Sequence, residues 1–221
     1  LGYVLALLVY LGSKNLTGLS KVVAGRRDES SLYRFLSQQE WDVEQVKQCR
    51  LEMLNRRARR TLKAMSKPGE PTPVFLIIDD SLVEKTGKKM EGVAKHQSHI
   101  SKQSVLGHVW VTGHVVVAGY SYPVEWKLYR RQTECEPAGV EFLSKPQLAE
   151  MIVKHFEPFP DTTTYVLTDS WYSSQDMLKL CDQRGFKYIG AVKPNRKFKL
   201  SEHNLQVRQW SQRIPGSAFV R

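Results

Sequence analysis

The 221-residue sequence has few cysteines and lacks a long apolar run. Its three cysteines form no Cys-x-x-Cys pair and are too few for a disulfide-stapled secreted domain, so we expect a reducing, cytoplasmic compartment. The apolar segment 1–11 is far shorter than the ~20 residues of a membrane span, and no membrane partner is expected. It also lacks the basic start of a signal peptide. We expect it to form a buried helix.

Acidic residues are also scarce. The sequence has 22 Asp and Glu against 33 Lys and Arg, which gives a net charge of +11. Residues 1–70 and 193–221 each carry a net charge of +6, whereas residues 71–192 carry −1. Two basic flanks around a near-neutral centre suit a polyanionic partner, and nucleic acid is the commonest one in cytoplasm. A solvated basic surface is the alternative that composition leaves open.

Residues 17–38 have the pattern of two short helices joined by a turn at Gly25. In the second helix, Leu32, Phe35 and Leu36 form one apolar face behind an Asp28 or Ser30 N-cap. Such a pair is consistent with a DNA-reading helix-turn-helix and equally with any three-helix bundle. The basic residues expected on its exposed side are Arg26, Arg27 and Arg34.

Residues 40–66 have the spacing of one long amphipathic helix. Its polar faces are strongly basic, which suits contact with a phosphate backbone, although a solvated face gives the same pattern. We expect Arg56, Arg57 and Arg60 to contact DNA. We assign residues 1–66 to a small all-α DNA-binding region and the Pro- and Gly-containing residues 67–73 to a linker.

The central part of the sequence alternates between strand and helix patterns. The patterns predict strands at 73–80, 105–119, 121–131, 164–170 and 187–195 and helices at 145–159 and 173–186. The strands at 73–80 and 164–170 are continuous apolar runs, as expected when both faces are buried. This order fits an α/β fold with a ribonuclease H-like mixed sheet flanked by helices. We assign it to residues 74–199.

Two apolar strands end near an aspartate, Asp80 in LIIDDS and Asp169 in VLTDSWY. A buried carboxylate costs free energy unless it is paired, hydrogen-bonded or bound to a metal ion. For a single aspartate, capping of the strand end is the simpler explanation. Because the first and fourth strands are neighbours in this fold, the two carboxylates are expected to converge. Hard oxygen ligands of this kind suit Mg²⁺ or Mn²⁺.

The segments IIDDSLVEKTGKKMEGVAKHQSHISKQSVLGHVWVTGHVVVAGYSYPVEWKLYRR and TDSWYSSQDMLKLCDQRGFKYIGAVKPNRKF resemble the catalytic domain of DDE transposases from bacterial insertion sequences. By this resemblance Asp80 is the first metal-binding aspartate, with Asp79 as the alternative, and Asp169 is the second. FLSQQEWD is similar to the end of the family's N-terminal DNA-binding region.

The sequence departs from the family at the third carboxylate. The family's glutamate lies within Tyr-x2-Arg-x3-Glu-x6-Lys, and this motif does not occur in the 221 residues. Glu202 is the only glutamate after Asp169 and lacks the surrounding motif. We expect residues 200–221 to begin a β-rich insertion and the catalytic glutamate to lie beyond Arg221, so that the sequence is a fragment.

The resemblance implies a metal-dependent enzyme that cleaves double-stranded DNA at the inverted-repeat ends of its element and transfers the strand to target DNA. It further implies a Mg²⁺ or Mn²⁺ cofactor, a dimer on two DNA ends, and a bacterial cytoplasmic location at the nucleoid. A catalytically inactive, transposase-derived DNA-binding protein is the main alternative. A ribonuclease H-like nuclease acting on repair or RNA–DNA substrates is a weaker one.

Residues at the ends of the fourth and fifth predicted strands add to this site. Lys193 and Arg196 follow the last strand at the sheet end that carries Asp169, and we expect them to contact DNA phosphates. Trp171 and Tyr172 follow Asp169 directly. We expect both rings to pack in the core, with stacking on an unpaired base as the alternative.

Overall fold

The structure, a computed structural model, describes residues 2–12, 15–23, 28–40, 42–67, 69–98, 101–200 and 203–213. The chain forms two compact units, Leu1–Glu52 and Met53–Arg221. Their boundary falls inside the long helix α4 (Val43–Met65), which therefore contributes residues to both. Among the described residues, no helix is long and apolar enough to cross a membrane.

The first unit contains the helices α1 (Gly2–Val9), α2 (Leu16–Ser20) and α3 (Glu29–Ser37). The two short helices predicted between residues 17 and 38 are thus present. Side chains cap both of them: Asn15 Oδ1 accepts from the Gly18 amide and Asp28 Oδ1 from the Ser31 amide, each at 2.7 Å. The predicted turn at Gly25, together with Arg26 and Arg27, lies outside the described residues.

The core of this unit is small. It consists of Ala6, Leu19, Val23 and Leu32. The prediction that residues 1–11 form a helix is correct, but the prediction that this helix is buried is wrong: Leu8 is 74% exposed and Ala6 is the buried residue of α1. Apolar residues follow one another in this segment without the 3.6-residue spacing that would place them on one face, so a single helix cannot bury them together.

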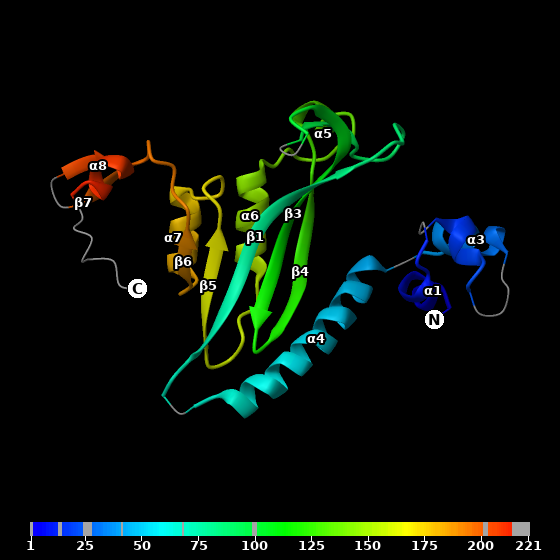
Figure 1. The fold of residues 1–221 in the computed structure, drawn as a ribbon, viewed down its shortest axis with the longest axis horizontal. Coiled ribbons are helices and arrows are strands. Elements are labelled where there is room, and N and C mark those ends of the chain that lie inside the picture. Colours follow the sequence, from blue (N-terminus) through cyan, green and yellow to red (C-terminus); the bar gives the residue numbers. More distant parts are fainter. Residues whose placement is uncertain are drawn as a thin grey trace. The chain divides into compact units, whose positions relative to one another are not determined.

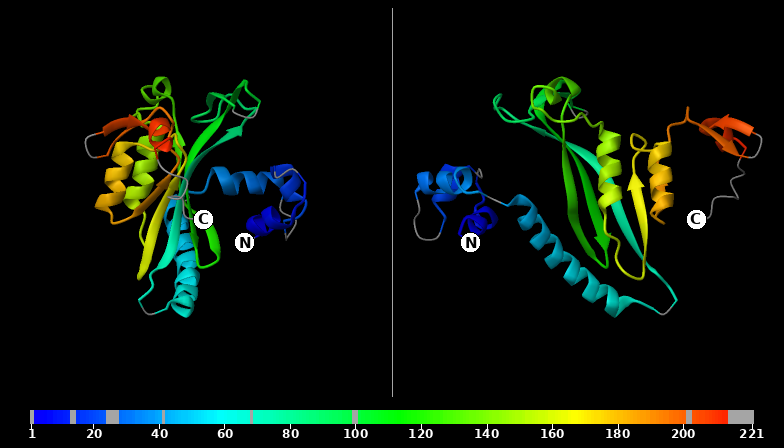
Figure 2. Two further views of the ribbon diagram at one scale, coloured as in Figure 1. Left: turned by 60° about the vertical axis from the view of Figure 1, so that its left-hand side comes forward. Right: turned by 180° about the vertical axis from the view of Figure 1, so that it is seen from behind.

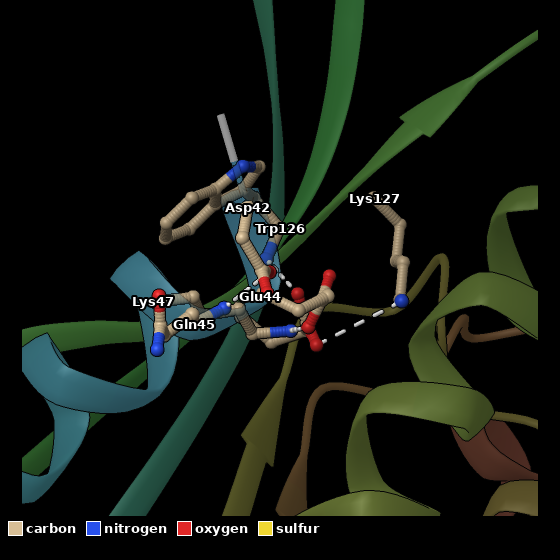
Figure 3. Close-up of polar contacts among 7 residues, drawn as sticks. Asp42, Glu44, Gln45, Lys47, Trp126 and Lys127 are labelled. Carbon is tan, nitrogen blue, oxygen red and sulfur yellow. Dashed lines mark hydrogen bonds and ion pairs between the residues drawn. The ribbon is translucent and has the colours of Figure 1, made fainter. Parts of the chain in front are cut away.

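Helix α4 begins behind Asp42, whose Oδ1 accepts from the Gln45 amide at 2.9 Å. Glu44 and Lys47 form an ion pair of 3.5 Å in its first turns (Figure 3). Farther along, Ala58 and Leu62 are buried in the hydrophobic core of the second unit. The helix therefore uses a narrow apolar stripe for packing and leaves its remaining faces to polar and charged side chains.

The second unit is a sheet covered by helices (Figure 1). Its strands are β1 (Thr72–Glu84), β2 (Ala94–Gln97), β3 (Ser104–Val117), β4 (Tyr120–Tyr129), β5 (Thr162–Thr168) and β6 (Lys187–Gly190). Its helices are α5 (Gln132–Cys135), α6 (Lys145–His155) and α7 (Gln175–Gln183). The hairpin of β7 (Lys197–Leu200) and β8 (His203–Gln206) and helix α8 (Val207–Ser211) follow.

The six strands form one mixed sheet. β1 lies in the centre, antiparallel to β3 and parallel to β5; β3 also pairs with β2 and β4, and β5 pairs in parallel with β6. Without the short β2, the spatial order is β4-β3-β1-β5-β6. This order and these directions are the ribonuclease H-like arrangement that the sequence predicts, and the α/β fold class is confirmed.

Helices α6 and α7 lie side by side against one face of the sheet (Figure 2). On β1 this face carries Val74, Leu76 and Ile78, which are at most 1% exposed. Helix α6 approaches β3 so closely that a Cβ on Gly113 would lie 2.5 Å from Cγ2 of Ile152. The opposite face of β1 is half-buried, so the expectation that this strand is buried on both faces is wrong for the described residues.

The structure also contains elements that the sequence patterns did not predict. β2 has only four residues, AKHQ, and pairs with the start of β3. A short element of this kind has too few residues for a periodic pattern, because its pairing depends on strands already in place.

The strand predicted at 121–131 is present as β4. Within it, the Glu125 side chain accepts from the Trp126 amide and forms an ion pair with Lys127 at 3.7 Å (Figure 3).

Candidate active site

The ends of β1 and β5 bring the two predicted aspartates to one edge of the sheet. Parallel pairing of the two strands ends at Ile78 and Thr168. Asp169 is the next residue after β5, whereas Asp80 lies two residues farther along β1, which there still pairs with β3. The expectation that the first and fourth predicted strands are neighbours is confirmed. Carboxyl ends of adjacent parallel strands are a common place for functional side chains.

Both carboxylate oxygens of Asp80 have a partner. The Tyr172 hydroxyl donates to Oδ1 at 2.7 Å, and the Lys145 ammonium donates to Oδ2 at 2.8 Å. The side chains of Asp80 and Lys145 are each 23% exposed. This short, charge-assisted contact is partly shielded from water, so it is stronger than an ion pair on an open surface.

Lys145 lies at the start of α6, which places its side chain next to Asp80. Ser144 caps this helix by accepting from the Gln147 amide, while the Gln147 side chain accepts from the Ser144 amide at 2.9 Å. Lys145 is the first residue inside the cap, and its ammonium lies 5.6 Å from the centre of the Tyr129 ring. A cation at a helix N-terminus opposes the helix dipole, so Asp80 and the ring offset an otherwise unfavourable position.

Tyr172 is fully buried in the segment between β5 and α7. Burial raises the pKa of its hydroxyl well above the usual value, and the hydrogen bond to Asp80 and the charges of Asp80, Asp79 and Asp169 raise it further. The hydroxyl therefore keeps its proton and acts as a donor to Asp80.

Asp169 is held by its own loop. Its Oδ1 accepts from the Trp171 amide at 2.8 Å, and its backbone carbonyl accepts from the Ser173 hydroxyl at 3.1 Å. The Ser173 hydroxyl also contacts the Tyr188 hydroxyl at 2.8 Å and the Ala191 carbonyl at 2.6 Å. These bonds tie the loop to β6 and to the segment that follows it.

Asp79, the alternative first aspartate, is arranged differently from Asp80. Successive residues of a strand point to opposite faces, so Asp80 shares the helix-covered face with Ile78 and Asp79 does not. Asp79 is exposed, and its Oδ1 accepts from the Asp80 amide at 2.8 Å. Its carbonyl accepts from the Thr112 hydroxyl at 3.2 Å. Asp80 is therefore the aspartate that the helices position.

The side chains at these two strand ends offer the donor atoms that a hard divalent cation prefers. Asp80 and Asp169 offer carboxylate oxygens, the ligands that Mg²⁺ and Mn²⁺ prefer, and the Lys145 ammonium already places a positive charge against Asp80. In the part of the chain that the structure describes, no three His, Cys, Asp or Glu side chains gather into a ready metal cluster. Glu202 lies outside that part.

Of the residues predicted to bind DNA, Lys193 contacts the Asp169 loop. Its ammonium lies 4.7 Å from the centre of the Trp171 ring, within the range of a cation–π interaction. The prediction that Trp171 packs in the core is wrong, because its side chain is 57% exposed; for Tyr172 the same prediction is correct. Arg196 is exposed, and its amide donates to the Lys193 carbonyl at 3.0 Å.

The other predicted DNA-binding residues that the structure describes lie on helices. Arg34 is exposed on α3 of the first unit. Within the second unit, α4 exposes Arg56, Arg57 and Arg60 around the buried Ala58. Their exposure is compatible with phosphate contact, and among the described residues no side-chain hydrogen bond or ion pair links them to the aspartates.

Sequence reasoning assigned no role to Lys145 and did not connect Tyr172 with Asp80. One signal was available for the lysine: it directly follows Ser144 in SKPQ, where a capping residue and a proline indicate a helix start. A lysine in a first helical turn is unfavourable for the dipole and indicates a nearby acidic partner. The identity of that partner, 65 residues away, required the tertiary structure.

The solved structures that resemble this chain include two transposases, both with low structural similarity. The piggyBac transposase synaptic complex with hairpin DNA is 22% identical with a TM-score of 0.38, over 55% of this chain and 23% of that chain. The Drosophila P element transposase strand transfer complex is 11% identical with a TM-score of 0.37, over 95% of this chain and 47% of that chain.

The amino-acid sequence matches a known family over nearly its whole length. The family described as DDE superfamily endonuclease matches residues 1–217. A probable transposase for insertion sequence element IS701 from Microchaete diplosiphon is 27% identical over 203 residues. The match covers 90% of this chain and 50% of the relative, so the chain spans about half the length of that transposase. The family expected from the aspartate motifs is confirmed, and the chain belongs to the DDE superfamily endonucleases.

Proposed function

We propose that this chain acts in a transposase that cleaves DNA at the ends of its element and joins those ends to target DNA. The observation that carries the proposal is the placement of Asp80 and Asp169 at the same edge of neighbouring parallel strands. Membership in the DDE family supports the reaction class. Tyr172 and the Asp169 loop support the proposal further, because they hold the two carboxylates in fixed orientations.

In this proposal Asp80 and Asp169 hold Mg²⁺ or Mn²⁺ through their carboxylate oxygens. Such ions, when bound, activate a water or a 3′-hydroxyl and stabilise the leaving oxygen in phosphodiester chemistry. Tyr172 keeps Asp80 Oδ1 oriented, and the Trp171 amide does the same for Asp169. We expect a third carboxylate from outside the described residues, either Glu202 or a glutamate beyond Arg221.

The basic residues supply affinity for double-stranded DNA. Lys193 lies over Trp171 beside Asp169, where a phosphate near the reacting position would meet its ammonium. Exposed arginines on α4 and α3 add contacts that do not depend on base sequence. DNA binding is therefore expected to weaken steeply as the salt concentration rises. A dimer on two DNA ends remains part of the proposal.

The proposal is tested by metal-dependent cleavage of DNA that carries the element ends, using the protein as its gene encodes it. Asp80→Asn and Asp169→Asn should each reduce cleavage by about a hundredfold or more, because each removes a charged oxygen ligand. Asp182→Asn, an equal change of charge on the exposed surface of α7, should leave cleavage unchanged.

Cleavage that persists in Asp80→Asn and Asp169→Asn would contradict the proposed site. DNA binding without cleavage in the unaltered protein would instead favour the catalytically inactive, DNA-binding alternative. Binding of Mn²⁺ to the 221-residue chain is a second measurement that does not require turnover. It should be lost in Asp80→Asn and retained in Asp182→Asn.

A further inference from the structure

Each carboxylate oxygen of Asp80 accepts a hydrogen bond from a side chain that the proposed function does not use as a metal ligand. We propose that Tyr172 and Lys145 hold Asp80 in its ligating position while no divalent cation is bound, and that Lys145 yields Asp80 Oδ2 to the cation. This inference rests on the proposed function, because it concerns the same metal site. It makes Tyr172 and Lys145 positioning residues of that site.

Tyr172 fixes one oxygen permanently. Its side chain is fully buried, and its hydroxyl has a single proton, which it donates to Asp80 Oδ1 at 2.7 Å. The segment around it is anchored by Ser173 and by Ser174, whose side chain caps α7 by accepting from the Met177 amide at 2.9 Å. A buried donor in an anchored segment sets the rotation of the carboxylate and leaves Oδ2 as the oxygen that can change partner.

Lys145 supplies the exchangeable partner. Its ammonium lies 2.8 Å from Oδ2, and the pair remains reachable from solvent because each side chain is 23% exposed. The lysine side chain is long and flexible, whereas Tyr172 is enclosed. The Tyr129 ring, 5.6 Å from the ammonium, offers a second favourable contact that does not depend on Asp80. Lys145 can therefore release Oδ2 without losing every partner.

Because both are positively charged, the Lys145 ammonium and a divalent cation cannot bind Asp80 Oδ2 at the same time. An ammonium at hydrogen-bond distance and a divalent cation on the same oxygen would repel each other at close range in a partly shielded site. The ammonium neutralises one negative charge, whereas the neighbouring ends of β1 and β5 carry two carboxylates, those of Asp80 and Asp169. Exchange of a single for a double positive charge thus matches the charge of the site more closely.

A merely structural ion pair would behave differently. Removal of such a pair lowers stability by the same amount with and without metal and leaves metal affinity unchanged or weaker. Removal of a competing ammonium instead raises metal affinity, since the cation no longer displaces a bound partner. The sign of the change in affinity therefore separates the two explanations.

The experiment titrates Mn²⁺ into the 221-residue chain and measures the free ion by electron paramagnetic resonance. Lys145→Met should bind Mn²⁺ about fivefold to tenfold more tightly than the unaltered chain, as expected for loss of a partly shielded ion pair. Lys145→Gln, which keeps polarity without charge, should change affinity in the same direction and replaces Lys145→Met if that variant does not fold. Lys145→Arg should keep the original affinity within about twofold because it restores the charge.

The matched control is Lys154→Met, the same substitution at an exposed position of the same helix. It should leave Mn²⁺ affinity unchanged within about twofold, which shows that net charge alone is not responsible. Tyr172→Phe should bind Mn²⁺ about threefold to tenfold more weakly, because Asp80 Oδ1 loses its fixed donor. Thermal unfolding of each variant with and without Mn²⁺ verifies that the chain is folded during the titration.

Unchanged or weaker Mn²⁺ binding in both Lys145→Met and Lys145→Gln would overturn the inference. The Asp80→Asn variant distinguishes that failure from failure of the proposed function. If Asp80→Asn loses Mn²⁺ binding while the lysine variants do not gain it, the metal site stands and the exchange by Lys145 is wrong. If Asp80→Asn binds Mn²⁺ as the unaltered chain does, the proposed metal site and the inference both fail.

Discussion

The ends of β1 and β5 hold their aspartates in opposite ways. Asp80 on β1 is bound by Lys145 and Tyr172, which are 65 and 92 residues away in the sequence. Asp169 after β5 is bound by the amide of Trp171, two residues away. One carboxylate thus depends on tertiary packing, and the other depends on a tight loop.

Because of this difference, we expect mutations to disturb the orientations of Asp80 and Asp169 in different ways. The orientation of Asp169 survives as long as its loop forms, because donor and acceptor belong to the same turn. The orientation of Asp80 requires α6 and the β5–α7 segment to be packed on the sheet at the same time. A change that loosens this packing should therefore affect Asp80 first.

The largest expected effect is that of Tyr172→Ala. The side chain is fully buried, so its truncation leaves a cavity and should lower the free energy of unfolding by ~3–5 kcal/mol. For a domain of this size the midpoint of thermal unfolding should fall by about 10 °C, measured by circular dichroism. Trp171→Ala is the matched control, because this neighbouring ring is 57% exposed.

The control should cost about 1 kcal/mol or less, since most of the Trp171 ring already contacts solvent. If Trp171→Ala destabilises the chain as much as Tyr172→Ala does, the two residues do not divide into a buried anchor and an exposed ring. The conclusion that tertiary packing orients Asp80 whereas a local loop orients Asp169 would then lose its main support.

A smaller effect is expected from Ser173→Ala, which acts on the Asp169 side. Its hydroxyl lies within hydrogen-bond distance of the Ala191 carbonyl, the Tyr188 hydroxyl and the Asp169 carbonyl. Loss of these contacts should lower the free energy of unfolding by ~1–2 kcal/mol. Hydrogen exchange of the Trp171 amide, which donates to Asp169, should become faster.

Ser104→Ala provides the control for this variant, since Ser104 is exposed at the start of β3. It should change neither stability nor the exchange of the Trp171 amide. Slow exchange of that amide in Ser173→Ala would show that the turn alone holds Asp169 and that its ties to β6 are unnecessary.

Local sequence patterns were sufficient for much of the fold. The apolar run before Asp80 and the one before Asp169 predict β1 and β5, and Gly185 correctly predicts the end of α7, where its φ of 67° favours glycine. The order of strands and helices then leaves few topologies, because parallel strands need a crossover helix between them. The neighbouring positions of Asp80 and Asp169 follow from that topology.

The parts that sequence did not predict depend on contacts between distant residues. Lys145 carries no motif that names Asp80 as its partner, and the contact exists because α6 packs on the sheet. The exposed Trp171 and the buried Tyr172 are adjacent aromatic residues with similar preferences for burial. Which ring turns inward is decided by the turn after β5, and the sequence does not encode that choice in its periodicity.

The smallest expected effect concerns pH, and it again belongs to the Asp80 side. His96 on β2 is buried, with 7% exposure, and its ring centre lies 6.2 Å from that of Tyr129. Burial lowers the pKa of His96 from its ordinary 6.5, and the positive charges of Arg131 and Lys145 lower it further. His108 acts in the same direction as these two, whereas Glu134 opposes them.

Because the unfolded chain then binds a proton more readily than the folded chain, stability should fall as the pH drops below about 6.5. The loss cannot exceed one proton, or ~1.4 kcal/mol per pH unit, and ends below the lowered pKa. His96→Phe should remove this part of the decrease between pH 7.5 and 5.5, measured by urea unfolding, whereas His155→Gln on the exposed surface of α6 should not. An undiminished decrease in His96→Phe would show that the acid sensitivity arises elsewhere and that the Asp80 side holds no buried group that charges in this range.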